Sequence, residues 1–254
     1  MQYVVFFLSI FMCIGAGTAY AGTNVPYVVD ANTIALYHFD EATLGVTPDA
    51  VGNHPGTLNG NAAISAGGKF GNGLLLDGSG DFVRLGNVHQ DPVKITWQGT
   101  VEAWVKLSSA LPPTFAVLAS GREYGGYWDD GWFLGRWATT GSPNLSFMIW
   151  KEGFGMQVAD SGIAASELVG GWHHLAGTWG PAGVQVWVDG VLKNTNFNYT
   201  SGLPNPGYQT ALVGAESNGN CTPGMIDEVR ISDIQRSFQA LRLPSAVLLL
   251  LLDD

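Results

Sequence analysis

The chain has 254 residues, of which 35 are glycine and 12 are proline, and its charged residues make up only 13%. A typical soluble domain has about a quarter charged residues, so this sequence has enough apolar residues for a large core. The net charge is −10, and no cluster of Lys and Arg occurs. Both features argue against nucleic acid as a partner, because binding a phosphate backbone requires clustered cations.

The first 21 residues are predicted to be a secretory signal peptide. Residues 4–14 are apolar but too few to span a bilayer, and Ala19-Tyr20-Ala21 supplies small residues at the cleavage position. The pattern departs from the usual one because no Lys or Arg precedes Lys69. A second apolar run, residues 246–252, has about a third of the length of a membrane span. We therefore expect a secreted protein, extracellular or at the cell surface, whose mature chain does not span a membrane.

Short apolar segments separated by Gly- and Pro-rich turns predict an all-β protein. No long helical period and no internal repeat occurs. The segments most typical of strands are Ile34–Glu41, Lys69–Val83, Thr100–Leu107, Trp172–Leu192 and Gly224–Ile231.

The segment Trp172–Leu192 predicts a strand followed by a tight hairpin. In residues 184–188 valines alternate with Gln185 and Trp187, which is the period of a half-buried strand. Asp189-Gly190 follows, and this pair suits a two-residue type I′ turn, in which both central residues need φ > 0.

Two adjacent histidines, His173 and His174, lie at the start of this segment. Neighbouring residues of a strand point to opposite faces, so the two imidazoles cannot bind one metal ion together. We expect a structural, hydrogen-bonded histidine.

In this order, the five segments resemble the laminin G-like branch of the concanavalin A-like jelly rolls. The resemblance implies a two-sheet antiparallel jelly-roll sandwich over residues 34–236, after a lead-in at residues 22–33 and before a C-terminal tail at residues 237–254. It also implies a secreted recognition module. One fold hosts many functions, so the resemblance does not identify the ligand.

The predicted central strand, Thr100–Leu107, has two different faces. Its aliphatic residues share one face, and Glu102, Trp104 and Lys106 share the other. In a sandwich the aliphatic face points inward between the sheets, so Trp104 points outward. Loops then cover Trp104, or it lines a sugar-binding face. We favour the first, because large exposed apolar surfaces are uncommon.

An aromatic and acidic segment at residues 121–131 is the candidate ligand-binding loop. Carbohydrate recognition needs flat aromatic faces for the C–H side of a sugar and planar polar groups for its hydroxyls, and rigid aromatics lose little entropy on binding. In the alternative interpretation these aromatics anchor the loop onto the sandwich. The candidate residues are Arg122, Tyr124, Tyr127, Trp128, Asp129 and Asp130.

A structural calcium ion is implied by the resemblance, since such domains often carry one between the first and last strands. Asp40 and Asp227 match the positions of its carboxylates, and the Gly52-Asn53-His54 loop would add carbonyl or amide oxygens. In the alternative interpretation each acid is solvated or caps a turn.

Catalysis is not expected. Glycosidases of this fold usually place their acids on one strand as Glu-x-Asp-x-(x)-Glu, which does not occur here, and Asp129-Asp130 would diverge on a strand. We therefore expect a non-catalytic module that binds an extracellular glycan or protein. The alternatives are a polysaccharide-active hydrolase or lyase with an unrecognised acid pair, and a structural or adhesive domain of a larger surface protein.

Overall fold

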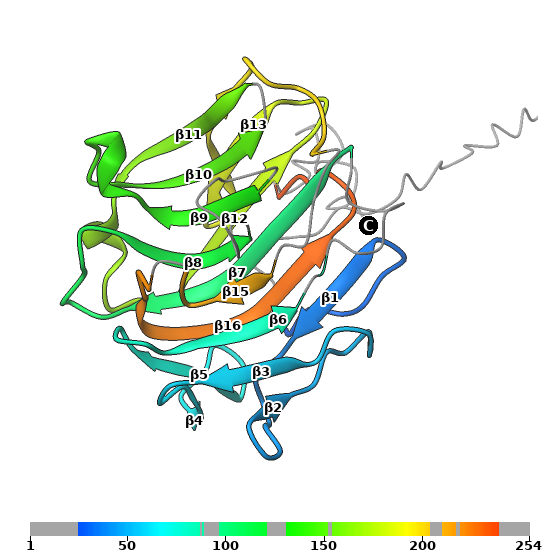
Figure 1. The fold of residues 1–254 in the computed structure, drawn as a ribbon, viewed down its shortest axis with the longest axis vertical. Coiled ribbons are helices and arrows are strands. Elements are labelled where there is room, and N and C mark those ends of the chain that lie inside the picture. Colours follow the sequence, from blue (N-terminus) through cyan, green and yellow to red (C-terminus); the bar gives the residue numbers. More distant parts are fainter. Residues whose placement is uncertain are drawn as a thin grey trace, which may run out of the picture.

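A computed structural model describes residues 25–86, 88, 97–120, 131–151, 154–203, 210–216 and 219–238 (Figure 1). The predicted signal peptide, most of the C-terminal tail and the candidate loop at residues 121–130 lie outside these ranges. No helix in the described part of the chain is long and apolar enough to cross a bilayer.

One eight-stranded antiparallel sheet, sheet A, contains both the first and the last strand. Its order is β14-β13-β12-β7-β16-β5-β4, and β1 also pairs with β16. Its strands are β1 (Thr33–Tyr37), β4 (Ala63–Ala66), β5 (Asn72–Asp77), β7 (Gly99–Leu107), β12 (His173–Trp179), β13 (Val184–Val188), β14 (Val191–Asn196) and β16 (Pro223–Ser232).

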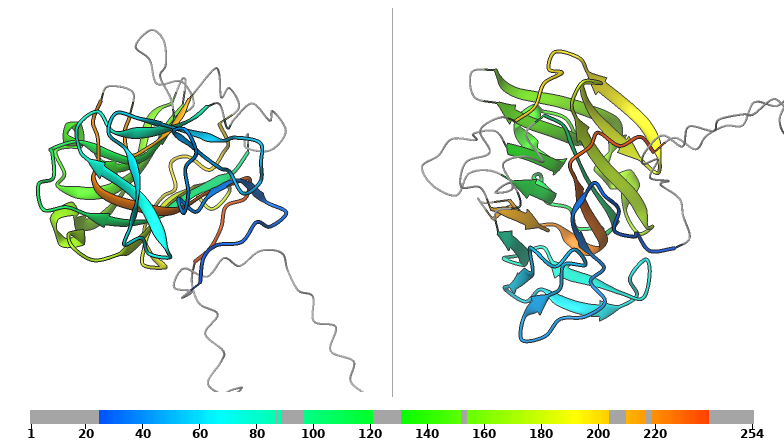
Figure 2. Two further views of the ribbon diagram at one scale, coloured as in Figure 1. Left: turned by 90° about the horizontal axis from the view of Figure 1, so that it is seen from below. Right: turned by 90° about the vertical axis from the view of Figure 1, so that its right-hand side faces the viewer.

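The second sheet, sheet B, also has eight antiparallel strands, in the order β11-β10-β9-β8-β15-β6-β3-β2. It stacks on sheet A (Figure 2), which confirms the predicted all-β sandwich. Its strands are β2 (Val46–Thr47), β3 (Gly56–Asn59), β6 (Phe82–Gly86), β8 (Phe115–Ser120), β9 (Gly131–Arg136), β10 (Asn144–Lys151), β11 (Gly155–Ala164) and β15 (Ala211–Val213). Two 3-10 helices, Ala138–Thr140 and Ala165–Leu168, complete the elements.

The core lies between the sheets, and alternation along each strand decides which side chains enter it. In β7 the predicted aliphatic set is buried there: Val101, Ala103, Val105 and Leu107. Gly177 of β12 lets the sheets approach, because a Cβ at that position would lie 1.9 Å from the Phe147 ring of β10.

The outer face of sheet A is covered around Trp104, as expected from the sequence. This side chain is 6% exposed and clusters with Tyr27 and Leu36, while Phe70 packs against the cluster. The Lys69 ammonium lies 4.0 Å from the centroid of the Trp104 ring. The lead-in segment and the turn before β5 therefore shield the strand from solvent.

Beneath this cover lies a buried ionic network centred on Glu102 of β7. Arg230 of β16 donates its Nε–H to Glu102 Oε1 at 2.8 Å, and Nε2 of His174 from β12 lies 3.0 Å from Oε2. His173 points the other way and contacts Asp189 at 2.8 Å, so the two histidines have the predicted opposite orientations and structural roles.

Segments from both ends of the domain meet over the network. The Tyr27 backbone N–H donates to Glu228, and the Tyr27 ring lies 4.4 Å from the Arg230 guanidinium. Asp30 accepts from Arg236 at 2.7 Å. Figure 2 shows the N-terminal (blue) and C-terminal (red) segments beside the same sheet.

The hairpin between β13 and β14 has the predicted turn. Asp189 has φ 51° and Gly190 has φ 73°, so both central residues are in the left-handed region. The Asp189 carboxylate also accepts the backbone N–H of His174, which links the turn to β12.

We predict that Gly190→Val destabilises the fold by about 1 kcal/mol or more, because a β-branched residue resists a positive φ. Urea unfolding measures the effect. Gly190→Asn is the matched control and is expected to cost less, since Asn tolerates this region. Equal stability of wild type and Gly190→Val would contradict the assignment of this turn.

The Glu102 network predicts a loss of stability in acid. Burial alone would raise the pKa of Glu102, but Arg230 and the hydrogen bond with His174 outweigh it and hold that pKa at about 2, below its ordinary 4.5. The stabilisation is complete above pH 4.5 and is lost as the pH falls through 2, amounting to about 3 kcal/mol. Urea unfolding between pH 6 and pH 2 should show this loss in the wild type and a clearly smaller one in Glu102→Gln. If the stability of the wild type and that of Glu102→Gln fell equally with pH, the role of the Glu102 network would be refuted.

Candidate binding site

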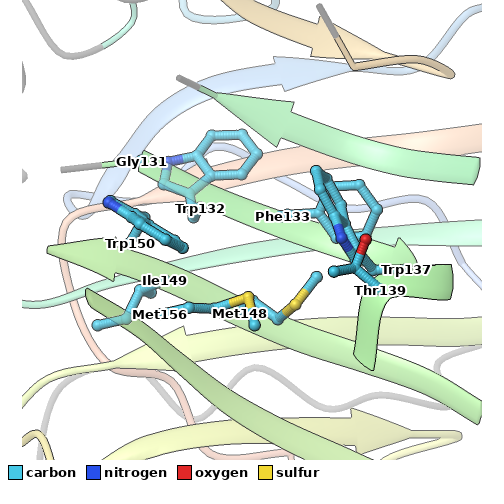
Figure 3. Close-up of a pocket in the computed structure, with 9 residues that line it drawn as sticks. All are labelled: Gly131, Trp132, Phe133, Trp137, Thr139, Met148, Ile149, Trp150 and Met156. Atoms are coloured by element: carbon cyan, nitrogen blue, oxygen red, sulfur yellow. The ribbon is translucent and has the colours of Figure 1, made fainter. Parts of the chain in front are cut away.

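A slot opens on the outer face of sheet B, over β9, β10 and β11 (Figure 3). Phe133 and Met148 lie on this face, because they alternate with Leu134 and Phe147, which enter the core. The slot has a volume of about 360 Å³. It is lined by Gly131, Trp132, Phe133, Trp137, Thr139, Met148, Ile149, Trp150 and Met156, and is called the β9–β10 slot below.

Aromatic side chains bound the β9–β10 slot at opposite ends (Figure 3). At one end Trp137, which follows β9, packs edge-on against Phe133 with ring centroids 5.1 Å apart. At the other end lies Trp150 of β10, which is only half-buried. Trp150 is the register partner of Gly131 on β9. Because Gly131 has no side chain, no group rises from the sheet at that position beside the Trp150 indole. The arrangement can hold a flat, C–H-rich group between rings.

The lining is almost entirely apolar. Met148 and Met156 run along one side, and Thr139, which is exposed, adds the only side-chain hydroxyl among the lining residues (Figure 3). None of these residues carries a carboxylate, an imidazole or a thiol. The described lining is therefore suited to recognition by shape and apolar contact rather than to acid–base chemistry.

The predicted ligand-binding residues lie outside the described part of the chain: Arg122, Tyr124, Tyr127, Trp128, Asp129 and Asp130. Their assignment stays a prediction. Asp130 directly precedes Gly131, the first residue of β9 and part of the slot lining.

Sequence reasoning missed the tryptophans of the slot. The apolar run of residues 145–150 predicts a strand, but the pattern alone assigns no role to its outward-facing side chains. The signal in the sequence is the alternation of Phe147 and Ile149 with Met148 and Trp150, because two large apolar residues on the face opposite the core indicate a binding surface or a cover.

The predicted calcium carboxylates border the same turn, residues 68–72. Asp40 accepts the Asn72 backbone N–H at 3.0 Å, and Asp227 accepts that of Phe70 at 2.9 Å. Asp227 is fully buried, and burial raises its pKa to about 7. Both carboxylates thus order this turn.

Asn53 is joined to a different carboxylate. Its backbone N–H donates to Asp49 at 3.1 Å, and Asp49 also accepts the N–H of Leu36, Val51 and His54. Asp49 therefore shapes the loop that was expected to supply calcium oxygens. Among the described residues, no group of three or more His, Cys, Asp and Glu side chains is placed to hold a metal.

Several solved structures share this architecture. Domain 4 of AbnA, a GH43 extracellular arabinanase from Geobacillus stearothermophilus solved with arabinotriose, has a TM-score of 0.63 at 22% identity, over 81% of this chain and 94% of that one. The binding domain of botulinum neurotoxin serotype D/C VPI 5993 has a TM-score of 0.56 at 16% sequence identity, over 82% of this chain and 50% of that one. Trypanosoma rangeli sialidase has a TM-score of 0.53 at 14% sequence identity, over 83% of this chain and 32% of that one.

This chain thus spans about half of the toxin domain chain and about a third of the sialidase. Among curated proteins, none matches the sequence. The family model described as the concanavalin A-like lectin/glucanases superfamily matches residues 77–241, well over half of the sequence. The chain belongs to the concanavalin A-like lectin/glucanases superfamily.

Proposed function

We propose that this protein is a secreted, non-catalytic recognition module that binds carbohydrate at the β9–β10 slot. The observation that carries the proposal is that Trp150 and Trp137 lie at opposite ends of the slot, and that Gly131, beside Trp150, has no side chain to fill the space between them. A sugar ring has a C–H-rich face that packs on an aromatic ring, and a rigid ring loses little entropy when it binds.

The solved relatives support carbohydrate as the ligand class. The arabinanase domain, which is similar in length to this one, was solved in complex with arabinotriose. At 22% identity this likeness shows the fold alone, so the ligand of that domain is a guide to the class to be screened. Tyr127 and Trp128, which precede Gly131 in the sequence, are proposed as further aromatic contacts of the ligand.

The composition of the slot supports binding without turnover. A retaining glycosidase needs two carboxyl groups about 5–5.5 Å apart, and an inverting one needs them about 6.5–9.5 Å apart. The described lining residues contribute none. Asp129 and Asp130, which directly precede Gly131 in the sequence, are the acids to test for the alternative, a polysaccharide-active enzyme.

We predict that Trp150→Ala weakens glycan binding by about 1–3 kcal/mol, judged from the stacking of bases on aromatic rings. A glycan array of the mature protein identifies the ligand, and calorimetry measures the affinity. Trp150→Phe keeps an aromatic ring, so this variant is expected to retain most of the glycan affinity.

Trp97→Ala is the matched control, because Trp97 is 70% exposed and lies outside the slot, just before β7. It should leave the affinity unchanged. If no glycan binds, or if Trp150→Ala binds as tightly as the wild type, carbohydrate recognition at this slot is refuted.

We further propose that a calcium ion binds beside residues 68–72 through Asp40 and Asp227. Calcium that binds only the folded state adds about 2.7 kcal/mol at a hundredfold excess over Kd. Chelator is expected to lower the melting temperature of the wild type, and to lower that of Asp40→Asn much less. Glu41→Gln, which changes the neighbouring exposed acid, should respond like the wild type. Identical melting curves with chelator and with excess calcium would rule the ion out.

A further inference from the structure

The described lining of the β9–β10 slot offers few polar side chains to the hydroxyl groups of a sugar. This described lining has one side-chain hydroxyl, on Thr139, and the indole N–H groups of three tryptophans, but no side chain whose main role is to accept hydrogen bonds and no amide or charged side chain. An unmodified sugar carries a hydroxyl on nearly every ring carbon. Burying a hydroxyl without a partner costs free energy, so a bare sugar gains little by entering such a slot edge-on.

The same lining is well suited to a small apolar group. Met148 and Met156 are unbranched and polarisable, and methionine adapts to irregular apolar shapes and packs favourably against aromatic rings. Trp150 lies at one end, and Phe133 lies with Trp137 at the other (Figure 3). A volume of about 360 Å³ lies at the small end of ligand pockets, which suits one sugar residue with its substituent better than an oligosaccharide buried along its length.

We propose that the β9–β10 slot selects glycans that carry an apolar substituent, namely an O-acetyl, O-methyl or 6-deoxy group. The substituent enters between the methionines and the Phe133 ring, and the C–H face of the sugar packs on Trp150. The hydroxyl-bearing edge stays in water. This inference rests on the proposed carbohydrate-binding function and names the class of carbohydrate.

The test compares each glycan with a matched form that differs only in the substituent. O-acetylated xylan is compared with the same polymer after mild alkaline deacetylation, and a fucoside is compared with the galactoside of the same configuration. The wild type is expected to bind at least one substituted form about tenfold more tightly than its partner. Tenfold corresponds to about 1.4 kcal/mol.

A substitution at the slot edge separates selectivity from binding. Met156 is 37% exposed, so Met156→Gln keeps the length of the side chain and adds an amide without disturbing the core. This variant should lose most of the preference for substituted forms. Met225→Gln, which makes the same change on β16 of sheet A, should keep it.

The outcomes are distinguishable. Equal affinity for both members of every pair, with loss of both on Trp150→Ala, overturns the selectivity and leaves carbohydrate binding intact. An equal preference in Met156→Gln and wild type places the selective contact elsewhere and also overturns it. No binding to any glycan overturns this inference together with the proposed function.

Discussion

The arrangement of sheet A depends on one buried carboxylate. Glu102 has no access to water, and its partners come from the two strands that flank β7: Arg230 from β16 and His174 from β12. A buried charge that loses its partner is strongly destabilising. A shift of either neighbouring strand by one residue would turn its polar partner of Glu102 to the core face, so the network selects a single register.

The two outer faces of the sandwich are therefore used differently. On sheet A the network needs a cover, and the segments that precede β1 and follow β16 provide it through Tyr27 and Arg236. On sheet B the residues beyond the core are apolar and uncharged around Trp150, and a slot remains. The polar side of sheet A thus holds the described segments that precede β1 and follow β16, while the described part of the outer face of sheet B contains the slot.

Much of this fold could be predicted from the sequence, because its strongest signals are local. Alternation identified the inward face of β7, and Asp189-Gly190 identified the turn before β14, since each depends on neighbouring residues only. The slot was missed because it forms only when β9, β10 and β11 pair in a particular register. The role of Tyr27 could not be inferred either, since its partners Glu228 and His174 lie 201 and about 150 residues away in the sequence.

The position of β16 also affects when this protein can fold. It is the last strand in the sequence, yet it lies between β7 and β5 and also holds β1. Without it, sheet A separates into two pieces and an unpaired strand. Synthesis must therefore pass residue 232 before the sandwich can close, and the earlier part of the chain waits with its apolar strands incomplete.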